Sequence, residues 1–462
     1  MPTESLTVVN PYDQKPIGTI PLVAWSTVDR YLEQAWDLFR QRDRWLPAYH
    51  RIEILEVTAQ IMASRQEELA FQIANEGGKP LADARVEVTR AIEGVKWCVR
   101  ELSHMTGQEI PMDLTEAGAG RIAFSTREPI GPVVTVSAFN HPLNLIVHQV
   151  APAVAVGCPV LVKPAPDTPL SCRAFVDILY EAGLPEEWVR NVVCDIPTAE
   201  RMIADKRVAF FSFIGSGQVG WMLRSKLAPG TRCALEHGGV APVIVDRDVD
   251  LNHLIPSILK GGFYHSGQVC VSVQRVFAPS DLAGEIAERL AEEASKLNVG
   301  NAIEETTQCG PLIRPLEVNR VDEWIHEAVS SGASLLCGGK PLGKTTYAPT
   351  VLLNPSSDCR VSTQEIFGPV VNVYEYEQID AAIKQANALP YAFQAAVFTD
   401  RLNVAMKAVR NLDATAVMVN DHTAFRVDWM PFAGRRESGL GVGGIGHSMH
   451  DMTQNKMAVI RL

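Results

Sequence analysis

The spacing of hydrophobic residues changes along the chain and separates a helical part from two alternating parts. From about residue 26 to residue 104, apolar side chains recur every three or four positions, as in VDRYLEQAWDLFRQ, which is the spacing of amphipathic helices. After Pro132, short β-branched runs alternate with helical stretches, namely VVTVSAF, LNLIVHQVAPAVAVG, VLVKP, a helix ending near Gly183, NVVC, VAFFSFIG and QVGWMLRSKLA. This alternation predicts βαβ units around a buried parallel sheet.

A second alternating series begins at Pro242 and runs through PVIVD, RVFAPS, DLAGEIAERLAEEASKL, VVNVYEY, IDAAIKQANAL, AAVFTD and TAVMVND. We therefore predict an α/β fold with two parallel-sheet domains and with Glu236 near their junction. The segments RIAFSTREP, from Arg121 to Pro129, and KMAVIRL, at residues 456–462, have strand patterns but belong to neither series. Outlying strands of this kind often pair between subunits.

The composition limits the classes of function. The chain has 462 residues, too many for one hydrophobic core, and its formal charge of -11 disfavours nonspecific binding to nucleic acid or to anionic membranes. It has no run of eighteen apolar residues and its first residues lack a signal-peptide pattern, so we expect a cytoplasmic protein. Its nine cysteines are dispersed without a CxxC pair, which argues against a disulfide framework and a structural zinc site; we expect no metal.

Two segments carry residues suited to covalent chemistry. Cys270 lies in HSGQVCVS and Glu236 lies in CALEHGG, and small residues surround both. A thiolate attacks electrophilic carbon, and a poorly hydrated carboxylate can take a proton from the thiol or from a later water. Taken alone, however, a single cysteine is more often a small buried hydrophobic residue, and a single glutamate more often lies on the surface.

The segment FIGSGQVG follows an apolar run and precedes a helix, so Gly215, Gly217 and Gly220 match a GxGxxG phosphate-binding pattern. A helix N-terminus can bind a pyrophosphate through its free N–H groups. No acidic residue other than Glu236 stands about twenty positions further on, so an ordinary dinucleotide-binding fingerprint is a strained interpretation. Close packing of the helix on a strand would also explain these glycines.

Seven segments taken together are more specific than any one of them. In chain order they are SAFNHPLNL, VLVKPAPDTPLS, FFSFIGSGQVG, ALEHGGVAPVIVD, GQVCVSVQRVF, QEIFGPVV and PFAGRRESGLG. They resemble the aldehyde dehydrogenase superfamily over nearly the whole chain. Within it, the chain most resembles the branch that includes lactaldehyde, succinate semialdehyde, phosphonoacetaldehyde and sulfolactaldehyde dehydrogenases. The resemblance implies an NAD(P)-binding domain at 1–106 and 126–238, a catalytic domain at 239–446 and an oligomerisation element at 107–125 and 447–462, and thus a homodimer or homotetramer.

The resemblance implies a role for each catalytic residue. Cys270 matches the nucleophile that attacks the aldehyde, and Asn140 matches the amide that holds the developing oxyanion. Glu236 matches the base that activates water to hydrolyse the thioester. Relatives that transfer the acyl group to coenzyme A lack this glutamate, so its presence favours a free acid as product.

The resemblance also implies an NAD or NADP site, whose residues would be Phe139, Lys163, Pro166, Gly215, Ser216, Val219, Glu365 and Phe367. Pro166 stands where many NAD-preferring relatives carry a glutamate, so nothing there repels a 2′-phosphate, and we expect NADP to be tolerated and preferred. Gln149 and Gly443 stand where many relatives carry a lysine and a glutamate that are sometimes assigned to a proton relay. That relay is expected to be absent here.

Polar residues replace the apolar lining that relatives acting on apolar aldehydes carry in the substrate channel. The matching positions are Arg90, His141, Asn144, His148 and Arg426. A basic pocket predicts a small aldehyde that is hydroxylated or that carries an anionic group at its far end. Arg90 could instead be a surface residue paired with Glu87 or Glu93.

Two other classes of function stay open at this point. One is a hydrolase that uses Cys270 as its nucleophile, and tight binding of NAD or NADP would argue against it. The other is a binding or structural protein that has kept the fold without activity, although intact Cys270, Glu236 and Asn140 argue against that. We expect no nucleic-acid or membrane partner, so the expected partners are the aldehyde and further copies of the chain.

Overall fold

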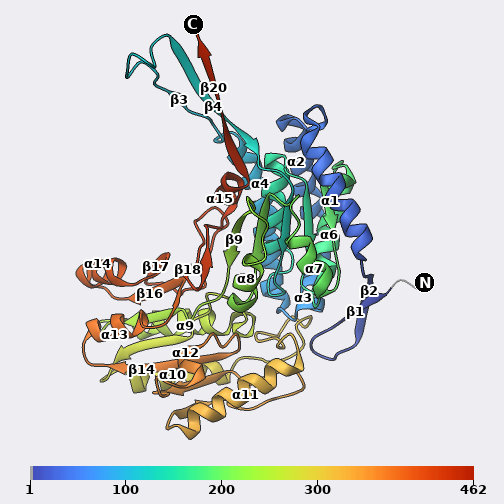
Figure 1. Ribbon diagram of the computed structural model, residues 1–462. Coiled ribbons are helices and arrows are strands. Elements are labelled where there is room, and N and C mark those ends of the chain that lie inside the picture. The colour runs from blue at the N-terminus through green and yellow to red at the C-terminus, as the bar shows by residue number, and fades with distance from the viewer. Residues whose placement is uncertain (1–3) are drawn as a thin grey trace.

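The computed structural model describes residues 4–462 and contains two large mixed α/β units and a projecting arm (Figure 1). The first sheet has the strand order β19 (Gly439–Leu440), β9 (Arg232–Glu236), β8 (Phe210–Ile214), β5 (Val133–Val136), β6 (Val160–Lys163) and β7 (Val189–Asn191). Its strands are parallel except β19. Helices cover both faces, as the alternation of strand and helix predicts.

The two faces of this sheet bury different helices. One face packs against α2 (Ala48–Ser64), α3 (Gln66–Gly77), α4 (Leu81–Leu102), α5 (Asn144–Val156), α6 (Pro169–Glu181) and α15 (Ile445–Asp451). The other packs against α1 (Trp25–Arg40), α7 (Ile196–Ile203) and α8 (Gly217–Arg224). Side chains alternate between these faces along each strand, so Phe211 and Phe213 lie on the α8 side while Ser212 lies on the α5 side.

The second sheet has seven strands. They are ordered β12 (Ser334–Cys337), β13 (Thr350–Leu353), β14 (Val370–Tyr376), β11 (Arg275–Pro279), β10 (Pro242–Val245), β16 (Gln394–Phe398) and β17 (Ala416–Val419), and only β12 is antiparallel. Its helices are α9 (Leu251–Phe263), α10 (Ala283–Ser295), α11 (Pro315–Ser330), α12 (Arg360–Thr363), α13 (Ile379–Ala386) and α14 (Leu402–Asn411). The prediction of two largely parallel sheets is confirmed.

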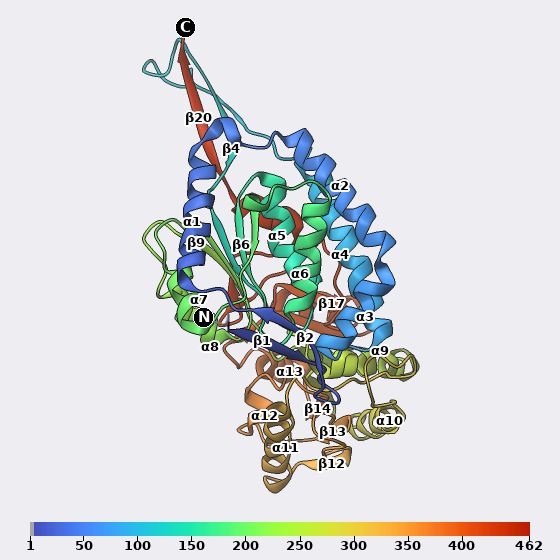
Figure 2. The same ribbon diagram turned by 90° about the vertical axis from the view of Figure 1, so that its right-hand side faces the viewer.

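The outlying strands form the arm. β4 (Arg121–Pro129) lies between β20 (Thr453–Arg461) and the short β3 (Glu109–Ile110), and the arm carries the C-terminus at its tip (Figure 1). A hairpin of β1 (Ser5–Val9) and β2 (Pro16–Pro21) lies near the boundary of the two large units (Figure 2). A strand expected over NVVC instead covers Val189–Asn191, and the N–H of Val192 makes one further bond to the carbonyl of Val162 in β6.

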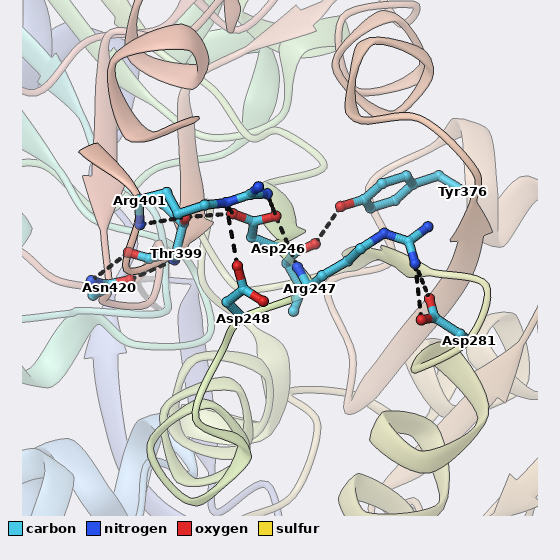
Figure 3. A network of polar contacts seen from close by, with 9 residues as sticks. Asp246, Arg247, Asp248, Asp281, Tyr376, Thr399, Arg401 and Asn420 are labelled. Carbon is cyan, nitrogen blue, oxygen red and sulfur yellow. Dashed lines mark hydrogen bonds and ion pairs between the residues drawn. The ribbon is translucent and has the colours of Figure 1, made fainter. Parts of the chain in front are cut away.

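A buried carboxylate ties together the carboxyl ends of the strands of the second sheet. Asp246 follows β10, and its side chain accepts hydrogen bonds from Thr399 Oγ1 at 2.6 Å and from Arg401 Nε at 2.9 Å (Figure 3). Tyr376 at the end of β14 donates to the carbonyl of Val245 beside it. Burial would raise the pKa of Asp246, but the hydrogen bonds from Arg401 and Thr399 outweigh it and lower that pKa.

Asp246→Asn is expected to lower the free energy of unfolding by about 1–3 kcal/mol at pH 7, because it leaves buried donors without their charged acceptor. The stabilisation by Asp246 is fully present above the ordinary carboxyl pKa near 3.8 and is lost as the pH falls through the lower folded pKa. The difference between variant and parent should therefore shrink below about pH 4, measured as thermal midpoints from pH 7 to pH 3. Asp281→Asn, which breaks the exposed pair with Arg247, is the matched control and should cost less than about 1 kcal/mol.

Candidate active site

The candidate site lies where the carboxyl ends of the first sheet's strands meet the amino ends of the second sheet's strands. Asn140 follows β5 and Glu236 ends β9, while Cys270 precedes β11. Asn140 Nδ2 donates to the carbonyl oxygen of Gln268 at 2.9 Å, two residues before Cys270. This hydrogen bond joins the segment after β5 directly to the segment that carries Cys270, and the second N–H of the amide stays available as a donor.

Cys270 is partly exposed, while the residues before it are buried. Burial raises the pKa of its thiol to about 12, and the carboxylates of Glu365 and Glu236 add to this rise while Arg426 opposes it. The thiol is therefore protonated at neutral pH in this arrangement, and a base must remove its proton before it can attack carbon.

Glu236 is a buried carboxylate near Cys270 with the properties of that base. It ends β9, and burial raises the pKa of its carboxyl group, with Arg426 acting in the opposite direction. Gly443 lies against it, because a Cβ atom at that position would stand 2.0 Å from Glu236 Oε1. A side chain at position 443 would displace the Glu236 carboxylate from where it now lies.

Glu365 lies on the cofactor side of the predicted site. Its Oε1 is buried without a hydrogen-bond partner, and burial raises the pKa of its carboxyl group to about 8. Beside it, Phe367 makes an edge contact with Phe139, with ring centroids 5.8 Å apart. Gly238 must be a glycine here, since its Cβ would fall within 2.0 Å of the Glu365 carboxyl atoms.

The glycine-rich segment serves two purposes. Ser216 caps α8 without a side-chain bond, and Val219 in the first turn is exposed, so the helix presents unbonded N–H groups beside Gly215. Gly220 instead has a packing role, because a Cβ there would lie 2.0 Å from the ring of His237. The helix-packing interpretation therefore holds for Gly220.

Lys163 ends β6, and within residues 4–462 its ammonium group makes one hydrogen bond, to the carbonyl oxygen of Pro164 at 3.4 Å. Pro166 is exposed, and the nearby carboxylate of Asp167 is paired with Arg314. An orphaned buried carboxylate oxygen at Glu365, a weakly bonded lysine and an open helix N-terminus fit the ribose hydroxyls and phosphates of a dinucleotide.

Three of the predicted pocket residues meet around a carboxylate that the sequence analysis did not identify, Asp428. Arg90 binds it with both Nη2, at 2.8 Å, and Nε, at 3.2 Å. His148 Nε2 lies 2.8 Å from Asp428 Oδ1, and Asn144 Nδ2 donates to the same oxygen at 3.1 Å. Burial would raise the pKa of Asp428, but His148 and Arg90 lower it far below 3.8.

The alternative that Arg90 is a surface residue paired with Glu87 or Glu93 is wrong, because Arg90 pairs with Asp428. Glu93 pairs with Lys96 on the surface, and Glu87 is completely buried beside Lys79. Glu87 Oε1 accepts the backbone N–H groups of Leu143 and Asn144, each at 3.0 Å. A buried Lys–Glu pair therefore fixes the start of α5, between the residues Asn140 and His148 that the site uses.

The two pocket histidines are neutral at pH 7. Burial, together with Lys79 and Arg90, lowers the pKa of His141 well below 6.5. Burial lowers the pKa of His148 to about 4, with Arg426 adding to the shift. His141 Nε2 lies 3.4 Å from the hydroxyl of Tyr264. The positive charge of the pocket therefore comes from its arginines.

Arg426 differs from Arg90 in having no carboxylate partner. Its guanidinium lies 3.6 Å over the ring of Phe432, Nη2 is 3.5 Å from His148 Nδ1, and its buried Nε has no hydrogen-bond partner. Burial lowers its pKa, and Glu236, Asp428 and Cys270 partly offset that effect. The guanidinium is thus a free, half-buried donor close to the nucleophile and the base.

Asp428, Glu87 and Lys79 are the functional neighbours that sequence reasoning missed. Asp428 stands only two residues after Arg426, so an acidic residue in the same loop was the available signal. Lys79 and Glu87 are only eight residues apart, but nothing in the sequence shows that Glu87 also binds the backbone N–H groups of Leu143 and Asn144, which are more than fifty residues away. Within residues 4–462, no group of three His, Cys, Asp or Glu residues is placed to hold a metal ion, and no helix is long and apolar enough to cross a membrane.

Comparison with known proteins identifies the family. The model of the aldehyde dehydrogenase family matches residues 1–458. The chain belongs to the aldehyde dehydrogenase family. It is 36% identical over 460 residues to a 3-sulfolactaldehyde dehydrogenase from Priestia aryabhattai, covering 99% of this chain and 95% of that one.

Solved structures agree with this assignment. Aldehyde dehydrogenase 21 from Physcomitrella patens, in complex with the reaction product succinate, superposes with a TM-score of 0.96 at 35% identity, covering 100% of this chain and 95% of that chain. A glyceraldehyde-3-phosphate dehydrogenase from Methanocaldococcus jannaschii complexed with NADP gives 0.95 at 32% identity, covering 100% of both. This aldehyde dehydrogenase is therefore an NAD(P)-dependent oxidoreductase, as the motifs predicted, and the alternatives of a cysteine hydrolase and an inactive protein are wrong.

Proposed function

We propose that this enzyme oxidises a short aldehyde with an anionic far end to the free carboxylic acid, through a thioester on Cys270. The observation that carries this substrate class is the free guanidinium of Arg426 beside Cys270 and Glu236. An anion that enters the pocket would find a donor already desolvated and without an internal carboxylate.

In the proposed first half of the reaction, Glu236 takes the thiol proton and the Cys270 sulfur bonds to the aldehyde carbon. The oxyanion is held by the free N–H of Asn140 and by the Cys270 backbone N–H. NAD(P), when bound, accepts a hydride from that carbon. Glu365, Lys163 and the first turn of α8 would hold the dinucleotide, with Phe139 and Phe367 beside it.

In the proposed second half, Glu236 takes a proton from water while the water oxygen bonds to the thioester carbon. The C–S bond then breaks, and its electron pair returns to the Cys270 sulfur. Two protons leave Glu236 in each turnover, one from the thiol and one from the water. The second proton of the water passes from the acid to the Cys270 thiolate, which leaves a carboxylate product and restores the thiol.

The pocket contacts divide the predicted substrate residues into two groups. Arg90, Asn144 and His148 spend their donors on Asp428, so we assign them to a scaffold around that carboxylate. Arg426 is assigned to the substrate, and neutral His141 to the wall beside Tyr264. The names of two compared proteins support an anionic substrate, since one acts on sulfolactaldehyde and the other was solved with succinate.

We propose NADP as the preferred cofactor. The exposed Pro166 offers no carboxylate to a ribose 2′-hydroxyl, and the one acidic side chain next to it, Asp167, is paired with Arg314. Lys163 is close by in sequence with an ammonium group that has no ion pair within the described residues. A 2′-phosphate would therefore meet no free negative charge from this loop.

We propose that the arm mediates a homodimer or homotetramer. The outer edge of β20 is unpaired along nine residues, and the arm exposes Ile122, Phe124, Met457, Val459 and Ile460. An unpaired apolar edge of this kind is suited to pairing with another copy. We keep 1–106 with 126–238, 239–446, and 107–125 with 447–462 as the proposed domains, and a cytoplasmic location as a proposal because all nine cysteines are free thiols.

Cys270→Ala should abolish oxidation of every aldehyde while leaving NADP binding intact, because no covalent adduct can form. Glu236→Gln should slow steady turnover by at least about a hundredfold, since the water loses its base. Stopped-flow absorbance of the reduced cofactor and titration calorimetry with NADP measure these effects. Turnover by Cys270→Ala above about a hundredth of the parent rate would contradict the assignment.

Pro166→Glu should shift the preference from NADP toward NAD by about tenfold or more, since the new carboxylate would repel a 2′-phosphate. The ratio of kcat/KM for the two cofactors, at one fixed aldehyde concentration, measures the shift. Pro166→Gln is the uncharged control and should change the ratio little. A parent enzyme that binds NADP a hundredfold more weakly than NAD would contradict the argument from this loop.

Arg426→Gln should raise KM for an anionic aldehyde such as succinate semialdehyde about tenfold to a hundredfold, because the substrate charge loses its desolvated partner. KM for propanal should change less than about twofold. Arg90→Gln is the matched control: it weakens the support of Asp428 and should affect both aldehydes equally while lowering the thermal midpoint. Equal effects of Arg426→Gln on the two aldehydes would show that this arginine is structural.

A further inference from the structure

Glu236 needs a route for the protons that the proposed function places on it. Its carboxylate makes no side-chain hydrogen bond within the described residues, and Gly443 and Gln149 beside it offer no ionisable group. A carboxyl group that kept the thiol proton could not activate water. The inference below rests on that proposed role of Glu236.

A small cavity extends from Glu236 along the α5 face of the first sheet. Its volume is about 10 Å³, which is room for about one water molecule. Sheet register explains the space. Ser212 of β8 pairs with Ala234 of β9, and two residues later along both strands Ile214 pairs with Glu236. Two small side chains therefore stand where a parallel sheet would otherwise present branched apolar ones.

The cavity wall carries polar atoms with hydrogen-bonding capacity that other protein groups leave unfilled. Gln149 Nε2 donates to Ser212 Oγ at 3.0 Å, while Gln149 Oε1 is buried with no hydrogen-bond partner. Ser212 Oγ accepts that bond and retains its own hydrogen as a donor. Ser448 of α15 lines the same cavity. These groups could give one water molecule the two to four polar contacts that a buried water requires.

Asp451 also lines this cavity, three residues after Ser448 and thus on the same side of α15. It also lines a second, larger pocket of about 660 Å³, together with Arg224, Thr231 and Arg232. No hydrogen bond ties its carboxylate to another side chain within the described residues, although its backbone carbonyl accepts from Arg232. Asp451 is thus shared by the inner cavity and the outer pocket.

We propose that Asp451 carries protons from Glu236 to solvent. Glu236 gives its proton to a water in the inner cavity, and that water gives one of its own protons to Asp451. Asp451 then releases the proton into the outer pocket, and Glu236 is again a base. No bond to carbon changes in this step and no electrons are transferred.

The surroundings of Asp451 suit a group that holds a proton briefly. Burial raises its pKa, while His450 and His447 of α15, Arg232 of β9 and Arg127 of β4 oppose the rise. Its carboxyl group is therefore easier to protonate than that of an exposed aspartate.

Asp451→Asn tests the route through the lifetime of the acyl-enzyme. This lifetime is measured by rapidly quenching mixtures of enzyme, NADP and a radiolabelled aldehyde at successive times. The acyl-enzyme should decay about tenfold more slowly than in the parent, and the rise of kcat with pH should move to higher pH. Asp451→Glu should restore most of the rate. Asp177→Asn, on the exposed face of α6, is the matched control for loss of one charge and should behave as the parent.

Ala234→Val gives an independent test, because it fills the cavity and removes no ionisable group. It should lengthen the acyl-enzyme lifetime as Asp451→Asn does, and the double variant should be no slower than either single one. If Asp451→Asn keeps the parent's acyl-enzyme lifetime and pH profile, the exit route is wrong. If the parent forms no acyl-enzyme with any aldehyde, the proposed function itself fails, and the route with it.

Discussion

The buried carboxylate of Glu87 is the interaction on which the site depends. It lies within the protein with no exposed surface, is paired with Lys79 and accepts the first backbone N–H groups of α5. A buried ion pair contributes little net stability, but removing one partner strands the other charge at a cost of several kcal/mol. The position of Glu87 explains its importance for the site. Its carboxylate binds the backbone at the point where the turn that bears Asn140 ends and the helix that bears His148 starts.

A second carboxylate, Asp428, organises the pocket in the same way. Asp428 lies on a loop that belongs to the other sheet, and it accepts hydrogen bonds from side chains of α4 and α5. Arg90, Asn144 and His148 are therefore fixed relative to one another. Because Asp428 pairs with Arg90, Arg426 is the pocket arginine without a direct ion pair among the described residues. The selectivity of a site therefore depends on which charges are already paired, and a count of its basic residues would overstate the positive charge here.

Most of the fold, and part of the candidate site, could be predicted from the sequence. β4 and β14 match the expected segments residue for residue, since alternating or continuous β-branched runs define them clearly. The strand near Val192 was misplaced, because an apolar run cannot show where a chain leaves a sheet edge. The positions of Cys270, Glu236 and Asn140 followed from their motifs. The partner of Arg90 could not be found in this way, because it lies 338 residues away and only the closed fold brings the two together.

The contact between Gly443 and Glu236 has a consequence for how this lineage can change. A Cβ at position 443 would occupy the space of the Glu236 carboxylate. Any side chain at position 443 would therefore have to share its space with the Glu236 carboxylate. A substitution at one of these two positions is thus expected to require a compensating change at the other.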